Sequence, residues 1–200
     1  MIKALLSLLT LILLSSCSLA PFASNKSGKS YGAGNSRFEL GSANSGYYIK
    51  LGFGASENLD IGYVMEFGGF PTSGIFLKYS LANNDTGASH ATEFGYGGTE
   101  TSTYYYAGFI SSIAFTKDFE LFVNPRLVKV QTDEKDVELG DTVGNVIVTE
   151  YDLSYVYLSA GMNLWLTETF GLSIYSIYVN GHGLETEENL STATTAIFRF

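Results

Sequence analysis

Residues 190–200, LSTATTAIFRF, end the chain and decide the fold class. Alternate residues counted back from the end are apolar or uncharged: Phe200, Phe198, Ala196, Thr194 and Thr192. The residues between them carry hydroxyl groups and the charge of Arg199. A period of two places successive side chains on opposite faces of a strand, and about ten tilted residues cross a membrane. The stretch therefore predicts a transmembrane β-strand with one face toward lipid and the other toward a polar interior.

The composition fits a single folded domain rich in β-structure. The chain has 200 residues, of which 46% are hydrophobic and only 3 are Pro, so a disordered chain is excluded. Its 14 Tyr and 14 Phe are typical of the aromatic girdles of membrane barrels, although a soluble β-sandwich uses the same residues. The formal charge of −9 argues against nucleic acid as a partner, because nucleic acid requires clustered cations.

The N-terminus carries a secretory signal. Residues 1–16 contain one cation and an apolar run at 4–14 that is too short for a spanning helix. The following LSSC at 14–17 resembles the bacterial lipobox, which implies that Cys17 is acylated and becomes the mature N-terminus. Cleavage after Ala20 by ordinary signal peptidase is the alternative, and Pro21 after the cut disfavours it. The domain organisation expected is a signal peptide over 1–16, an acylated cysteine with a flexible linker over 17–36, and a barrel over 37–200.

The linker prediction rests on composition. Residues 18–36 are rich in Ser, Gly, Ala and Asn, which favours a flexible chain. The GKS at 28–30 has the end of a phosphate loop but lacks its upstream glycine, so no nucleotide site is expected.

Alternating segments from residue 37 onward predict an all-β, single antiparallel barrel of about ten strands. Tight turns are expected at 56–58, 117–118 and 167–169, and Pro125 predicts a bulge or an interrupted ladder. An even number of strands returns both chain ends to one side, which we expect to be the periplasm. Without the two weakest segments, 37–42 and 90–97, the count is eight. The ten segments are 37–42, 47–55, 59–67, 75–81, 90–97, 103–116, 119–130, 146–166, 170–180 and 190–200.

Charged side chains fall on the face turned away from lipid. They are Arg37, Glu39, Lys50, Asp60, Glu66, Lys78, Glu93, Glu120, Arg126 and Arg199. Folding about the expected turns predicts a lumenal charge cluster of Lys50, Glu66 and Lys78. Large residues also meet small ones, since Trp165 is expected to face Gly171 and Tyr175 to face Gly161. Paired charges and such ring–glycine contacts favour a lumen filled by side chains.

Over residues 37–200 the chain resembles small bacterial outer-membrane β-barrels of the OmpX and OmpA membrane-domain type. The resemblance rests on the strand periodicity and on the terminal aromatic pattern of Phe198 and Phe200, which resembles a barrel-assembly signal. It implies an outer-membrane location in a Gram-negative bacterium. The partners implied are outer-membrane lipid, lipopolysaccharide, and the barrel-assembly and lipoprotein-sorting machineries.

The function expected is structural or surface-interacting, with two alternatives. A narrow channel for small solutes is one, and a lipid A-modifying hydrolase using His182 with Ser176 or Ser191 is the other. The spacing of these residues matches no hydrolase motif, so no catalytic residues are predicted. The acidic loop 133–141 lacks the ligand spacing of a calcium loop, so no metal site and no cofactor beyond lipid on Cys17 is expected.

Overall fold

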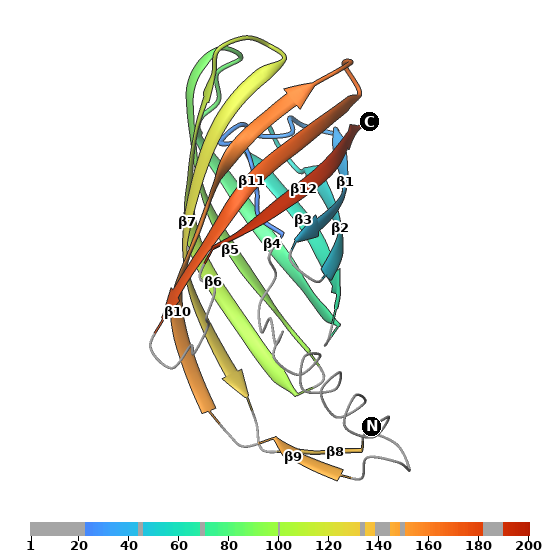
Figure 1. Ribbon diagram of the computed structural model, residues 1–200. Coiled ribbons are helices and arrows are strands. Elements are labelled where there is room, and N and C mark those ends of the chain that lie inside the picture. Colours follow the sequence, from blue (N-terminus) through green and yellow to red (C-terminus); the bar gives the residue numbers. More distant parts are fainter. Residues whose placement is uncertain are drawn as a thin grey trace, which may run out of the picture.

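Ten strands of this computed structural model form one closed antiparallel barrel in the order β1-β12-β11-β10-β7-β6-β5-β4-β3-β2 (Figure 1). The structure describes residues 23–43, 46–68, 71–99, 101–132, 135–138, 145–148, 151–181 and 190–200. The barrel strands are β1 (Ser36–Ala43), β2 (Gly46–Gly54), β3 (Leu59–Phe67), β4 (Thr72–Ala82), β5 (Gly87–Gly98), β6 (Ser102–Ala114), β7 (Phe119–Thr132), β10 (Tyr151–Trp165), β11 (Phe170–Gly181) and β12 (Leu190–Arg199). Both the antiparallel barrel and ten strands rather than eight are therefore confirmed.

A separate two-stranded sheet, β8 (Lys135–Glu138) with β9 (Asn145–Val148), lies in the chain between β7 and β10. The segment predicted as one strand over 146–166 is thus two strands, and the segment predicted as a loop over 131–145 contains the end of β7 and all of β8. Within the described ranges there is no helix with the length and hydropathy needed to cross a membrane.

The ends of β1 and β12 close the barrel. Backbone N–H groups of Ser36 and Phe200 donate to each other's carbonyls, with N···O distances of 2.9 and 3.0 Å. We call this end the turn end, because it also carries the short connections 55–58, 83–86, 115–118 and 166–169. The opposite end, which leads from β7 to β10, is called the loop end (Figure 1). The predicted turns at 56–58, 117–118 and 167–169 therefore lie together beside the C-terminus.

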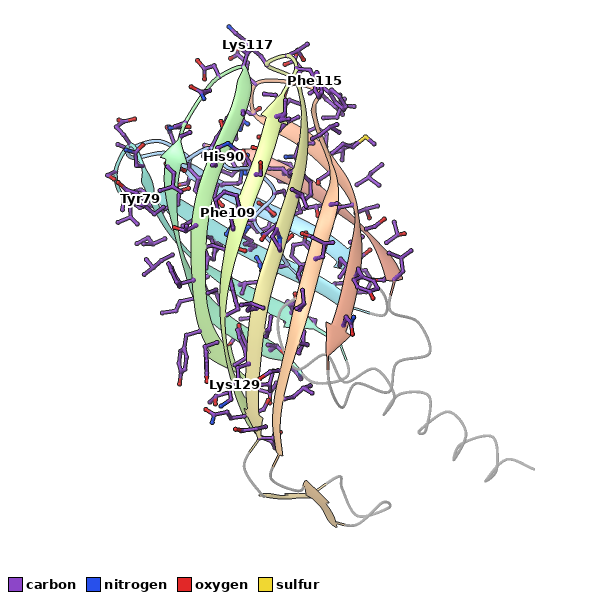
Figure 2. All side chains as sticks on the ribbon, turned by 90° about the vertical axis from the view of Figure 1, so that its left-hand side faces the viewer. Tyr79, His90, Phe109, Phe115, Lys117 and Lys129 are labelled. Atoms are coloured by element: carbon purple, nitrogen blue, oxygen red, sulfur yellow. The ribbon has the colours of Figure 1, made fainter. Side chains whose placement is uncertain are left out.

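Side chains alternate between an apolar outer wall and a closed interior. On β7 the outward Leu121, Val123 and Leu127 are exposed, whereas the inward Asn124 and Arg126 are buried. Figure 2 shows the same outward direction for Tyr79 on β4 and Phe109 on β6. The period of two in the sequence is thus the alternation between the two faces of the wall.

Pro125 interrupts the ladder without shifting its register. Pairs between β6 and β7 are present at Gly108 with Arg126 and at Ser111 with Val123, and the two positions between them are unpaired. The missing N–H of proline accounts for this gap. The register shift in the barrel lies elsewhere, between Ser80 and Ala82 of β4.

Aromatic rings over glycines fill much of the lumen. Trp165 pairs with Gly171 and Tyr175 with Gly161, as predicted. A Cβ atom at Gly171 would lie 2.8 Å from the Trp165 ring, so only glycine fits there. Most of the inward rings belong to one buried cluster, which includes Phe76, Tyr104, Tyr106, Phe122, Tyr157 and Tyr175.

Candidate functional site: the occupied lumen

Residues 23–31, which we call the lumenal segment, lie inside the barrel. Ala23 and the four residues after it are at most 3% exposed, and Figure 1 shows the chain here, in blue, within the ring of strands. The prediction of a flexible linker is wrong over these residues, and positions 17–22 of the predicted linker lie outside the described residues. Composition predicts flexibility for a chain in solvent, but here the polar groups find partners in the wall.

The segment runs along the barrel rather than across it. The N–H of Ala23 donates to Glu66 Oε1 over 2.6 Å, and Glu66 is the next-to-last residue of β3, near the loop end. The Ser30 hydroxyl donates to Asp60 Oδ1 over 2.7 Å, and Asp60 is the second residue of β3, near the turn end. The chain therefore runs from the level of Glu66 toward the turn end before it enters β1.

Lys26 is the buried cation of the segment. Its Nζ atom lies 2.5 Å from Glu39 Oε2, and both side chains are almost completely buried. The second oxygen of Glu39 lies 3.5 Å from Lys50 Nζ. The rings of Tyr48 and Tyr175 have their centroids 5.3 and 5.2 Å from the Lys26 ammonium. A buried ammonium is costly unless it is paired, so this pocket fixes the position of Lys26.

Glu93 is the second point of attachment. It accepts hydrogen bonds from the side-chain amides of Asn25, at 2.7 Å, and Asn124, at 2.8 Å, and it pairs with Arg126. Arg126 also donates to the Ala23 carbonyl over 3.1 Å. The segment thereby supplies two of the partners that satisfy this buried ion pair.

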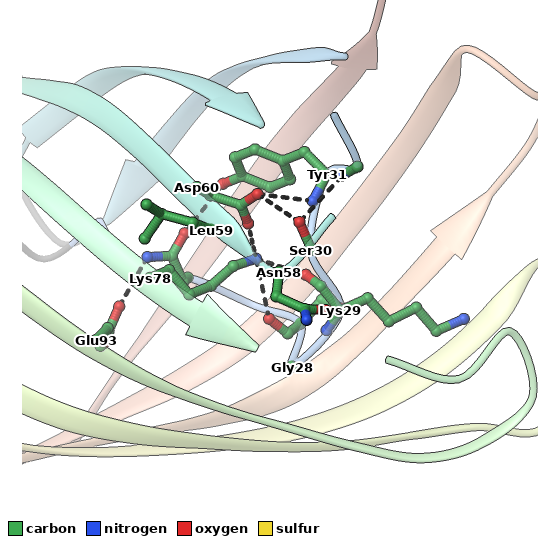
Figure 3. A network of polar contacts seen from close by, with 12 residues as sticks. Gly28, Lys29, Ser30, Tyr31, Asn58, Leu59, Asp60, Lys78 and Glu93 are labelled. Atoms are coloured by element: carbon green, nitrogen blue, oxygen red, sulfur yellow. Dashed lines mark hydrogen bonds and ion pairs between the residues drawn. The ribbon is translucent and has the colours of Figure 1, made fainter. Parts of the chain in front are cut away.

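Asp60 and Lys78 form the third point of attachment (Figure 3). Lys78 Nζ lies 2.8 Å from Asp60 Oδ2 and 2.5 Å from the Lys29 carbonyl that it donates to. Asp60 Oδ1 accepts from the N–H of Tyr31 at 3.0 Å, in addition to the Ser30 hydroxyl. The Tyr31 ring lies 4.3 Å from the same ammonium.

The segment also fits closely against the wall on the side of β5, β6, β7 and β10. Ser27 donates to Glu120 over 2.7 Å, and the N–H of Gly28 donates to Ser112 Oγ over 3.0 Å. A Cβ atom at Gly28 would lie 2.8 Å from the backbone nitrogen of His90, so the segment cannot carry a side chain there. Asn163 donates to the Lys26 carbonyl over 2.7 Å.

The predicted cluster of Lys50, Glu66 and Lys78 is wrong because of the position of Lys78. Glu66 lies opposite Tyr48 and diagonal to Lys50, as predicted. All three side chains are buried in the lumen. In the β3–β4 register, however, Lys78 faces Asp60 and Glu66 faces Thr72. Six residues of strand, about 20 Å, therefore separate the levels of Glu66 and Lys78. Lys50 and Lys78 take Glu39 and Asp60 as their carboxylates, and Glu66 binds the backbone of the lumenal segment.

The wider prediction of an inward charged face is confirmed: nine of the ten residues are buried, and Arg199 lies opposite the buried Arg37 on the same face of the sheet. Arg199 is the exposed one, at the turn end. Its guanidinium lies over the Trp165 ring at 3.2 Å from the centroid, and Arg37 lies 5.3 Å from the same centroid. Stacking on an aromatic face is favourable for guanidinium groups.

The other predicted residues lie on the outer wall or outside the described residues. Phe198 packs between Phe38 and Phe170, with centroids 5.9 and 5.2 Å apart, and Phe200 is exposed. Recognition of this aromatic pattern by an assembly machinery stays a prediction. Cys17 and His182 lie outside the described residues. Among the residues that the structure describes, no three His, Cys, Asp or Glu side chains could hold a metal ion.

No protein-family model matches the chain, and no curated protein matches it. Among solved structures it is similar to the N-terminal β-barrel domain of Pseudomonas aeruginosa OprF, at 11% identity and a TM-score of 0.38, over 84% of this chain and 99% of that one. It is also similar to the KdgM porin in complex with disordered oligogalacturonate, at 7% identity and a TM-score of 0.45, over 83% and 99%. It is similar as well to the β domain of the Bordetella autotransporter BrkA, at 13% identity and a TM-score of 0.35, over 83% of this chain and 96% of that one.

Proposed function

We propose that the protein is an outer-membrane barrel, anchored by lipid on Cys17, whose lumen is closed by its own chain. Its role is structural or surface-interacting rather than that of an open channel or an enzyme. The observation that carries the closed lumen is the burial of Ala23–Ser27 among the wall's ion pairs. A water-filled conduit along this path would require the lumenal segment to leave.

The outer wall supports the membrane location. On β7 the apolar outward face extends from the turn residue Asp118 to Lys129, which pairs with Asp152 at 3.1 Å. Figure 2 shows Lys129 far from Phe115 and Lys117, which mark the turn end. Eleven residues at about 3.3 Å each, tilted by about 40°, span about 28 Å. The apolar band of outer-membrane barrels is about 25 Å tall.

Aromatic side chains border this band at both ends. The turn end carries Phe38, Phe115, Phe119, Phe170 and Phe198, and the loop end carries exposed Tyr47, Tyr96, Tyr105 and Tyr178. Such rows of aromatic side chains are typical of the two membrane interfaces. Outer-membrane lipid and lipopolysaccharide are therefore the partners we propose for the wall, with the assembly and sorting machineries acting on Phe198, Phe200 and Cys17.

Planar-bilayer recordings of the full-length protein test the closed lumen. We expect the wild type to show no steady conductance. Replacing Ser24–Ser27 together by glycine removes the side chains that contact Ser159, Glu93, Glu39 and Glu120, and we expect conductance steps to appear. The matched control replaces the exposed Ala33 and Asn35 by glycine and should stay silent. Steady conductance of the wild type would instead establish the channel alternative.

The mass of the mature protein tests the anchor. We expect the mature protein to begin at Cys17 and its mass to include added acyl chains. Each methylene of these chains that is buried in the membrane contributes about 0.8 kcal/mol to membrane binding. Cys17→Ser should lose this mass while the barrel still inserts. A wild-type mass without acyl groups contradicts the anchor and leaves the barrel in place.

A further inference from the structure

The direction of the lumenal segment fixes which end of the barrel the chain enters. Ala23 contacts Glu66 and Arg126, whereas Tyr31 contacts Asp60. The N–H of Gly34 then donates to the carbonyl of Gly54, the last residue of β2, and Ser36 meets the C-terminal residue. The chain thus passes through the lumen toward the turn end and reverses there into β1.

We propose that the protein is threaded through its own barrel, so that the chain before Ala23 emerges at the loop end, on the membrane face opposite the C-terminus. A second part of this proposal rests on the proposed lipidation: the acyl chains on Cys17 insert into the leaflet at the loop end. This topology differs from the sequence-based expectation that both chain ends lie on the periplasmic side.

The barrel wall beside Ala23 is short, so the chain before Ala23 has only a small distance to cover to leave the lumen at the loop end. β3 ends one residue after Glu66, and β1, β2 and β3 have only 8, 9 and 9 residues, compared with 14 and 15 in β7 and β10. Cys17 is six residues before Ala23, a distance of at most about 20 Å for an extended chain. The loop end of this short wall is therefore within reach of the acylated residue.

The opposite route is occupied. If the chain before Ala23 led to the turn end instead, it would have to run through the lumen alongside the lumenal segment. Lys26 fills the space between Glu39, Tyr48 and Tyr175, and the Tyr31 ring covers Gly52 so closely that no Cβ fits there. At Gly54 the backbone of Gly32 leaves no room for a Cβ either. Beside β1 and β2 the lumen thus holds one chain, packed against the wall. On the other side of the segment, a cavity of about 660 Å³ lined by Lys29, Glu120 and Arg199 opens at the turn end.

The loop end of the short wall also suits a lipid anchor. Tyr47, the second residue of β2, pairs with Phe67, the last residue of β3, and both are exposed on the outer wall. Their place beside the exit gives the acyl chains an apolar surface at the membrane interface. An anchor in this leaflet lies against the wall that the chain has just left.

Labelling with a membrane-impermeant maleimide tests the threading. Three variants of the full-length chain, each keeping Cys17, carry one added thiol: Leu19→Cys before the lumenal segment, Thr101→Cys at the loop end and Lys117→Cys at the turn end. In intact cells and after permeabilisation, we expect Leu19→Cys to react under the same condition as Thr101→Cys and not under that of Lys117→Cys. The comparison between variants gives the same answer whichever way the barrel is oriented in the membrane.

Two results overturn the threading: Leu19→Cys reacting together with Lys117→Cys, or Leu19→Cys unreactive on both sides in a mature protein whose mass shows that residue 19 is retained. The parent protein separates this from the lipid proposal, because its single cysteine reacts only if it is not acylated. A labelled parent therefore refutes the anchor, while the Leu19→Cys comparison, measured as the label added above the parent, still decides the threading.

Discussion

The two halves of the lumen are closed in different ways. Toward the loop end, rings from the strands pack over glycines of neighbouring strands, as Tyr104 does over Gly97 and Tyr106 over Gly95. Toward the turn end, where Trp165 over Gly171 is one such pair, the wall also provides charges, and the lumenal segment pairs with them. The first closure is part of the strands and forms with the barrel. The second depends on a segment outside the barrel strands, so it alone can be removed without changing the wall.

Arg126 joins the two halves, and replacing it should have the largest effect. Its guanidinium pairs with Glu93 and the Ala23 carbonyl, and it lies 4.4 Å from the centroid of Tyr106. Arg126→Met leaves the buried Glu93 carboxylate without its cation, which costs about 3–5 kcal/mol. We expect that loss in the free energy of unfolding, measured by urea titration in detergent with the fluorescence of the single Trp165.

Lys129→Met is the matched control on the same strand. Lys129 points outward and its pair with Asp152 is exposed, so we expect little change in the urea midpoint. Equal losses in both variants would mean that the inner and outer ion pairs of β7 do not differ, and would contradict the division between lumen and wall.

Lys26→Met tests the turn-end half alone. The substitution keeps the length of the side chain but removes the cation at 2.5 Å from Glu39, which then retains Lys50 at 3.5 Å. Loss of a hydrogen bond to a charged group costs about 2 kcal/mol. We expect a decrease of that size in the free energy of unfolding, together with frequent openings in planar bilayers. Lys29→Met, at the less buried position three residues on, should remain stable and closed.

The outer wall and the ring–glycine pairs could be predicted from the sequence, because both depend on local geometry. A period of two places alternate residues outward, and a tight turn at 167–169 fixes the pairing of Trp165 with Gly171. The predicted position of Lys78 is wrong, although the connection between β3 and β4 has four residues, as many as that between β10 and β11. Folding about this connection places Lys78 opposite Asp60, six residues along β3 from Glu66.

The lumenal segment could not be predicted either, for a different reason. Residues 23–31 show no alternation of apolar and polar side chains, and most of them are polar or glycine, so nothing in their sequence indicates burial. Their partners, among them Glu39, Glu93 and Glu120, come from β1, β5 and β7 and meet only after the barrel closes. The signal that could have pointed to the segment is the pair of glycines at 52 and 54, which leave room at the turn end that no wall residue fills.

Tyr104→Phe should give the smallest change and tests the loop-end half. The Tyr104 hydroxyl donates to the Ser73 carbonyl over 3.2 Å, and the ring is fully buried. Removing the hydroxyl keeps the ring over Gly97, so we expect a loss of about 1 kcal/mol in the free energy of unfolding and no conductance. Tyr96→Phe, on the outer wall, is the control and should be neutral. Openings in Tyr104→Phe would show that hydroxyl bonds, rather than ring shape, close this half, and the contrast between the two halves would be lost.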